Sequence, residues 1–342
     1  MSGFLRALRG ELYALFHRRS LRIGLVLVVL GVLLRMMLAR LAAGVIPGGG
    51  AEAAANYWPR FAQAAGFGLG LAELATLVLV GAALPREIAS AAVRDPMTRG
   101  ISRVGFVLAR GLTALLCPFV LGGAAVLTAA LGCAVLYDGG HVVSAPFVMN
   151  QQPEAEAAFH DWLAEEGLRP DQLAAWLYMV EEDGLEGAAA AAALGLPAFE
   201  LPDDYYSFIP ILVFLEDEVA DGIHAALAQA LAPLTALALF AFLLSMLLPT
   251  GALASGLATM LVVLFSVFLA PEMGAGASWF FADWLPGIGH DSALKLAERV
   301  AEGYTDSVPP DPEVLAAGAR ATWIQAGLYF AAATALFPRK KL

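Results

Sequence analysis

The chain has 342 residues, of which 59% are hydrophobic and only 15% are charged, and its formal net charge is −11 at pH 7. Soluble domains carry about 25% charged residues, so this composition excludes an ordinary soluble globular protein. Long uncharged apolar runs supply the hydrophobic excess, and runs of roughly 18 or more residues are typical of membrane-spanning helices. We therefore expect an all-α integral membrane protein.

Residues 1–20 are predicted to form an amphipathic helix that lies in the membrane interface. Apolar residues recur there at helical spacing, and basic residues occupy the other side of the helix. The alternative is a basic N-terminus that is simply solvated. The apolar residues of this pattern are Phe4, Leu5, Leu8, Leu12, Leu15 and Phe16.

Six transmembrane spans are predicted next from length and apolarity. Three fall within the segment 21–137, at 22–45, 66–84 and 104–136, and three within the segment 223–342, at 223–248, 253–270 and 320–337. The N-terminus, the connection between the second and third spans, and the C-terminus together hold 13 of the 20 basic residues. Lys and Arg concentrate on the cytoplasmic side of membrane proteins. We therefore expect both termini and the loop 86–103 to face the cytoplasm, with the chain in the cell (inner) membrane.

Two further segments are acidic and are predicted on the opposite side of the membrane. Residues 138–222 hold 18 of the 31 acidic residues and a single basic residue, Arg169. This segment is too long for a simple connection, and pieces such as AFHDWLAEEG and DQLAAWLYMVEED are typical of short amphipathic helices. We expect it to be a small external helical domain. The loop 271–319 is also predicted to be external, with the aromatic residues of GASWFFADWLPGIG at the membrane interface.

The chain has no motif for a catalytic centre. It contains no G-x-x-x-x-G-K-[ST], G-x-S-x-G or H-E-x-x-H sequence, and a P-loop ATPase needs the lysine of the first of these on the phosphates. We therefore expect no enzymatic activity and no cofactor in this chain, and any ATP hydrolysis must come from another polypeptide. The histidines of the acidic segments lack the spacing of metal ligands, so no metal site is expected.

The stretch LPREIASAAVRDPMTRGISRVGFVLARGL, residues 84–112, resembles the cytoplasmic loop of the permease subunits of type-two ABC transporters. In that family a Glu ends the second span, a short amphipathic coupling segment follows, and Pro-x-Ser-Arg and a basic residue enter the third span. Glu87 matches the Glu, Ser102 and Arg103 match the Ser-Arg, and Arg110 matches the basic residue. The chain departs from the family pattern at Ala91, Ala92, Asp95, Pro96 and Gly100.

The resemblance implies that this chain is the permease subunit of an ATP-driven transporter of the exporter class. Its partners would be two copies of a cytoplasmic ABC ATPase subunit, a second permease subunit that is identical or homologous, and the lipid bilayer, with no nucleic acid. The residues implied in ATPase coupling are Glu87, Arg94, Arg99, Ser102, Arg103 and Arg110. The alternative is a simple arginine-rich connector in a non-transporting membrane scaffold, whose acidic external domain binds an extracytoplasmic partner.

Three ionisable residues fall within the predicted spans. Glu73 lies in the second span, and Arg35 and Arg40 lie in the outer half of the first. Charges inside a bilayer are costly and are usually paired. Depth in the membrane predicts that Glu73 pairs with Arg40, or less favourably with Arg35. The alternative is that the first span ends near Arg40 and the arginines extend to the lipid headgroups.

Overall fold

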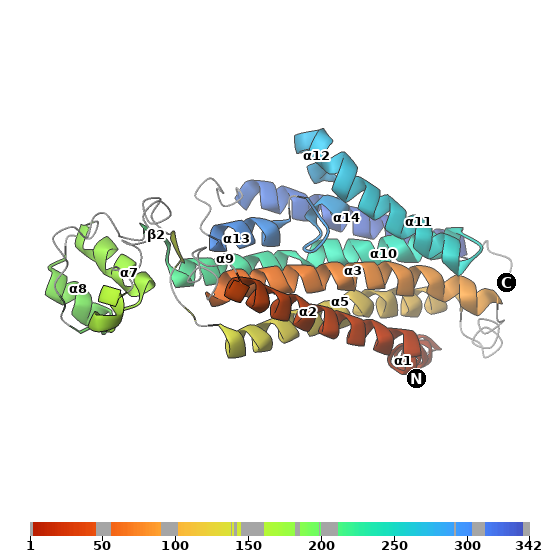
Figure 1. Ribbon diagram of the computed structural model, residues 1–342. Coiled ribbons are helices and arrows are strands. Elements are labelled where there is room, and N and C mark those ends of the chain that lie inside the picture. Colours follow the sequence, from red (N-terminus) through yellow and green to blue (C-terminus); the bar gives the residue numbers. More distant parts are fainter. Residues whose placement is uncertain are drawn as a thin grey trace.

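The computed structural model describes residues 3–45, 56–89, 102–137, 139, 142–144, 161–181, 185–197, 199, 211–290, 292–302 and 312–337. Figure 1 shows a bundle of long helices with a separate small group of helices, α7 and α8, beyond one end. The N-terminal helix and the end of the last helix lie at the opposite end. We call the end near the chain termini the terminal end and the other the far end.

The N-terminal segment forms α1, Gly3–His17, and after Arg18 the chain continues as α2, Arg19–Val45. Helix α1 packs against α5 and buries Ala7 and Leu15, while Leu5 and Phe16 are exposed. The segment is therefore helical, but of the six apolar residues in the predicted pattern only Leu15 is buried. Its position in a membrane interface remains a prediction.

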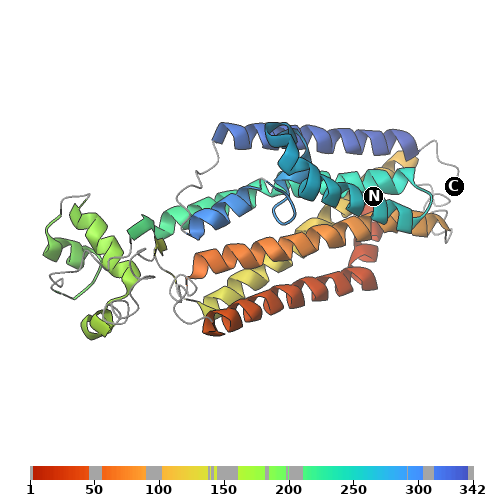
Figure 2. The same ribbon diagram turned by 45° about the horizontal axis from the view of Figure 1, so that its top comes forward.

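The middle of the bundle is built around α10, Leu231–Leu247, which continues the axis of α9, Glu216–Gln229. Four helices pack around α10: α3, Tyr57–Ala89; α5, Arg103–Leu136; α11, Gly251–Val263; and α14, Pro312–Leu336 (Figure 2). Helix α11 also packs against α3. Small side chains allow helices to approach closely. The buried surface of α10 includes the alanines Ala232, Ala236, Ala238 and Ala241.

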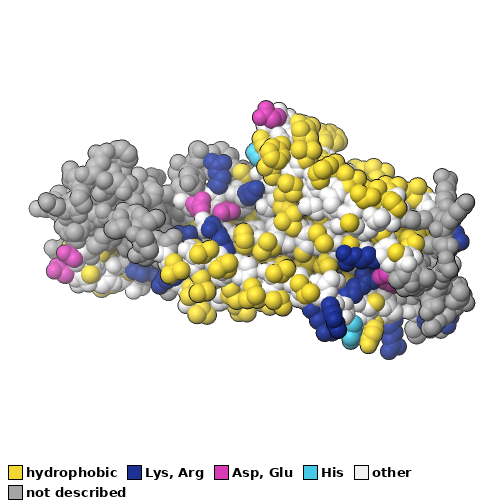
Figure 3. Space-filling view, turned by 45° about the vertical axis from the view of Figure 1, so that its right-hand side comes forward, with side chains coloured by type: hydrophobic (Ala, Val, Ile, Leu, Met, Phe, Trp, Pro, Cys, Tyr) yellow, Lys and Arg dark blue, Asp and Glu magenta, His cyan; other side chains and the backbone are white. Residues whose placement is uncertain are grey.

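Within the described residues, five helical segments are long and apolar enough to cross a membrane. Figure 3 shows a broad band of hydrophobic side chains, as expected for a protein that crosses a bilayer, and basic side chains lie at both ends of this band. These features indicate a multi-pass membrane protein with a helical fold. Helix α14 occupies the sixth predicted span but is not among the five, so that span remains a prediction. The five are Arg19–Leu41, Tyr57–Ala89, Arg103–Leu136, Glu216–Leu247 and Gly251–Met273.

The fifth of these segments is irregular, and the chain after it returns into the bundle. Helix α11 continues as a π-helix, η3 (Leu264–Leu269), and α12 (Ala270–Met273), followed by the 3₁₀ turns η4 (Gly274–Trp279) and η5 (Phe281–Trp284). Phe281 is fully buried, and its ring centroid lies 5.5 Å from that of Phe240 on α10 and 5.9 Å from that of Tyr329 on α14. The loop predicted at 271–319 is therefore partly inside the bundle, and α13, Ala293–Ala301, then runs beside α3 and α9.

The segment 138–222 contains short helices with a hydrophobic cluster of their own. Residues 161–166 are helical, as are α7, Pro170–Glu181, and α8, Gly187–Ala193. Two short strands are an addition to the predicted all-α fold: β1, Val142–Ser144, pairs antiparallel with β2, Ile211–Phe214. The buried residues of the cluster are Leu163, Leu168, Leu173, Trp176, Leu177, Ala190 and Ala191.

Candidate functional site

Four charged side chains meet at the terminal end of the bundle, and we call them the Arg110 cluster: Glu11, Arg18, Glu87 and Arg110. The Arg110 side chain is only 6% exposed. Its Nη2 donates to Glu87 Oε1 at 2.7 Å, and its Nη1 donates to Glu11 Oε2. Arg18 Nη2 donates to the same Oε1 of Glu87. Two arginines and two carboxylates thus form one continuous network.

Each member of the Arg110 cluster comes from a different part of the fold. Glu11 lies on α1, Arg18 between α1 and α2, Glu87 in the last turn of α3, and Arg110 near the start of α5. A helix C-terminus disfavours a carboxylate, because the helix dipole is negative there. The two arginines offset this effect at Glu87. Burial and the neighbouring Arg110 lower the pKa of Arg18.

The charges of the cluster balance, and a buried arginine needs such compensation. Removing either carboxylate would leave a cation in a place that water reaches poorly. The network therefore holds α1, α3 and α5 together.

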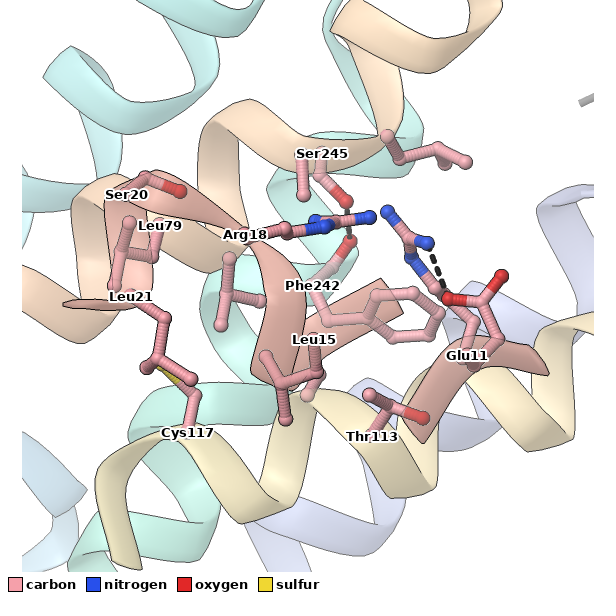
Figure 4. A pocket seen from close by; sticks show the side chains of 15 residues that line it. Glu11, Leu15, Arg18, Ser20, Leu21, Leu79, Thr113, Cys117, Phe242 and Ser245 are labelled. Atoms are coloured by element: carbon pink, nitrogen blue, oxygen red, sulfur yellow. Dashed lines mark hydrogen bonds and ion pairs between the residues drawn. The ribbon is translucent and has the colours of Figure 1, made fainter. Parts of the chain in front are cut away.

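A cavity opens beside the Arg110 cluster and is drawn in Figure 4. It contains about 510 Å³ of space, part of it open to the surface. Glu11 and Arg18 form its polar side, and Phe242 and Ser245 of α10 close it from the core. The cavity brings the central helix within reach of the charged network. Its remaining walls come from α1, α2, α3 and α5, through residues such as Leu21, Leu79 and Cys117.

The predicted coupling residues have different places in the structure. Glu87 and Arg110 are brought together at the terminal end, where Arg110 is buried. Its guanidinium is occupied by two carboxylates of this chain. Ser102 is the N-cap of α5, and its Oγ accepts from the Gly105 amide at 3.0 Å. Arg103 is exposed at the first position of α5.

Two of the predicted coupling residues, Arg94 and Arg99, lie outside the described residues. Two members of the cluster were not predicted, namely Glu11 and Arg18. A signal for Glu11 exists in the sequence, because it is the single acidic residue among the first 22. A lone acid on a basic helix is a natural partner for an arginine that begins an apolar span.

A second ionisable side chain, Glu73, lies at the midpoint of α3 and is fully buried. Its Oε1 accepts from the Gly287 amide at 2.8 Å, and its Oε2 accepts from the Ile288 amide at 2.9 Å. Both oxygens thus bind the segment that returns into the bundle after η5. This arrangement replaces the predicted ion pair with an arginine of the first span.

The two arginines proposed for that pair have other surroundings. The Arg40 guanidinium lies over the Tyr137 ring, 5.8 Å from its centroid, and Arg35 lines a pocket with Arg60. The partners of Glu73 are instead backbone amides, because a close backbone approach brings them there. A Cβ at Gly287 would overlap with the backbone of Gly70, one turn before Glu73 on α3. Only glycine permits this approach.

The described residues hold no group of three or more His, Cys, Asp or Glu side chains that could hold a metal ion. Cys117 and Cys133 are both buried thiols within α5. The two buried polar clusters connect parts of the fold. The Arg110 cluster joins α1, α3 and α5, and Glu73 joins α3 to the segment that follows η5. No protein-family model and no curated protein matches the chain.

Proposed function

We propose that the chain is the membrane-spanning permease subunit of an ATP-driven ABC transporter of the exporter class. It would act with two copies of a cytoplasmic ABC ATPase subunit and with a second permease subunit. The proposal includes six spans, a place in the inner membrane, cytoplasmic termini and an external domain at 138–222. Its first support is the resemblance of residues 84–112 to the coupling region of that family.

The observation that carries the proposal is the position of the Arg110 cluster. Helix α3 ends at Ala89 and α5 begins at Arg103, so the segment between them joins the helices that contribute Glu87 and Arg110. The 2.7 Å contact between these side chains holds the two helix ends together, and Glu11 adds α1 to the group. A soluble ATPase that moved this segment would therefore move three helices at once.

Movement of these three helices would be transmitted directly to the core of the bundle. The cavity beside the cluster is lined by α10, and α10 packs against α3, α5, α11 and α14. Transport through a membrane needs states that differ in the packing of such helices, and ATP binding would favour one of them through its different affinity for each. No catalytic residue is required in this chain.

The test is site-specific photo-crosslinking in native membranes. A photoreactive amino acid replaces Arg103, which is exposed at the terminal end, and in a matched control it replaces Asp217, which is exposed on α9. We expect the probe at Arg103 to form an adduct with a P-loop ATPase, identified by mass spectrometry, and the probe at Asp217 to form none. The adduct should decrease when ATPase expression is suppressed.

The same experiment addresses the alternative of a membrane scaffold. If neither position yields an ATPase and none copurifies with the full-length protein, the permease proposal is wrong. An adduct from Asp217 with an extracytoplasmic protein would then support the scaffold.

A further inference from the structure

Helix α1 uses one face to pack on the bundle and leaves two others exposed. On the inner face, Ala7 and Leu15 are buried and Glu11 accepts from Arg110 of α5. Leu5 and Phe16 lie three turns apart on one outer face and are 47% and 50% exposed. The outer surface of α1 is therefore apolar along one edge.

The second outer face of α1 is basic. Arg6 and Arg9 lie there beside Tyr13, and all three side chains are exposed. Figures 1 and 2 show that α1 runs across the direction of the long helices. In a protein whose long helices cross a bilayer, such a helix lies along the membrane surface. An apolar face and an arginine-bearing face are typical of helices in that position.

The start of α2 gives the depth at which α1 meets the membrane. Arg19 and Arg22 are exposed in the first turn of α2, directly after the junction with α1. Arginines that precede a lipid-facing apolar surface lie at the level of the headgroup phosphates. The next exposed side chains of α2 are all apolar, namely Ile23, Val26 and Leu27.

The carboxylates near α1 do not balance these exposed arginines. Residues 1–22 hold five arginines and a single acid, Glu11, which binds Arg110. Glu87 accepts from Arg18 and from Arg110. The segments that follow α3 and α14 in the sequence, 90–101 and 338–342, add five basic residues and one acid. The excess of positive charge therefore does not depend on where these two segments lie.

We propose that α1 and the first turn of α2 bind the phosphate groups of anionic phospholipids through Arg6, Arg9, Arg19 and Arg22. The planar guanidinium group presents several donors that match phosphate oxygens. An anionic lipid is favoured over a zwitterionic one, because the choline of phosphatidylcholine opposes the positive charge of the arginines. Each arginine near an anionic headgroup contributes about a fivefold factor in binding.

The apolar face of α1 favours a membrane over an acidic protein as the partner of these arginines. Leu5 and Phe16 can reach the acyl chains while Arg6 and Arg9 stay at the phosphates. An acidic protein that bound only the basic face would leave both apolar side chains in water. Lipid binding at α1 does not require the proposed transport function.

The experiment places the full-length protein in phosphatidylcholine nanodiscs that contain a trace of photoreactive phosphatidylglycerol. Mass spectrometry identifies the crosslinked peptides. We expect adducts on α1 and the first turn of α2, with a yield at least fivefold above that of photoreactive phosphatidylcholine with the same chains. Arg6→Gln/Arg9→Gln should lower the phosphatidylglycerol yield there tenfold or more and leave the phosphatidylcholine yield unchanged.

The matched control is Arg35→Gln/Arg40→Gln, which makes the same change at two exposed arginines in the second half of α2 and should leave the yield at α1 unchanged. Equal yields from the two lipids in the wild type would overturn the proposal, as would an unchanged phosphatidylglycerol yield in Arg6→Gln/Arg9→Gln. If that variant does not fold, Arg19→Gln/Arg22→Gln decides the question.

A second measurement tests the choice between lipid and protein. A photoreactive amino acid in place of Arg9 should form adducts with phospholipid in native membranes. Adducts mainly with a soluble protein would assign this face to a protein partner and overturn the proposal.

Discussion

Glu73 accepts hydrogen bonds from the backbone amides of Gly287 and Ile288, and we call this contact the clasp. It leads to a quantitative prediction. In Glu73→Gln only one side-chain oxygen remains to accept from Gly287 or Ile288, and the new NH₂ group faces the other amide. A hydrogen bond contributes about 0.5–1.5 kcal/mol, and a buried donor left unsatisfied costs about 1–3 kcal/mol. Because the two costs add, we expect a net loss of about 2–4 kcal/mol.

The measurement is unfolding of the detergent-solubilised protein, followed by tryptophan fluorescence. The matched control is Glu272→Gln, which makes the same chemical change at an exposed position on α12 and should have little effect. Gly287→Ala should destabilise the same contact without any change of charge, because its Cβ would overlap with Gly70. Equal stability of Glu73→Gln and Glu272→Gln would refute the clasp.

A double-mutant cycle separates the clasp from the ion pair expected from the sequence. Arg40→Gln added to Glu73→Gln should give additive losses within about 0.5 kcal/mol, because the two side chains have different partners. A coupling of more than about 1 kcal/mol between them would mean that the pair forms after all.

Three further predictions concern other parts of the molecule. Arg110→Met should destabilise the protein by about 3–5 kcal/mol, because it removes the buried cation from Glu11 and one of the two arginines from Glu87. The exposed Arg103→Gln should have little effect, and unfolding midpoints test both variants. Burial, together with repulsion from Glu302, raises the pKa of Glu298 to about 7, so the folded state holds its proton more tightly than the unfolded state, and stability should fall as pH rises from about 4.5 to 7. Glu298→Gln should flatten that dependence in pH-dependent melting. Cysteines placed at Arg103 and Asp217 should react with an impermeant thiol reagent from opposite sides of the membrane, and reaction from one side would contradict the proposed topology.

The long helices could be predicted from the sequence because a helix that crosses the hydrocarbon core of a bilayer needs a long run of apolar residues. The prediction underestimated their lengths, as for α3, which spans Tyr57–Ala89 rather than 66–84. Hydropathy detects the part of a helix that lies in hydrocarbon. It does not detect polar turns such as the one that carries Arg60 and Gln63, which continue the same helix beyond it.

The partners of the buried charges were harder to predict. The need of Glu73 for a partner follows from the cost of burial, but its partners are amides more than two hundred residues later in the chain. The sequence does not show which backbone amides bind a side chain. Only the glycine at position 287 indicates that the backbone can approach α3 closely there. For Arg110 the sequence placed Glu87 in the same motif but did not predict that the two side chains pair. It missed Glu11, whose role depends on how α1 folds back.

The alanines of α10 bear on how the bundle changes shape. A helix lined with large interlocking side chains can move past its neighbours only if many rotamers change together. Alanine has no side-chain rotamers, so a neighbouring helix that contacts α10 at an alanine can shift by a small distance without repacking that contact. Shear, in which packed helices slide, therefore costs less at these positions than at the large buried side chains of the same helix, such as Leu237 and Phe242. Ala236 and Ala238 are both fully buried, so a bulky residue at either position would hinder the sliding of helices along α10. The charged clusters would stay intact.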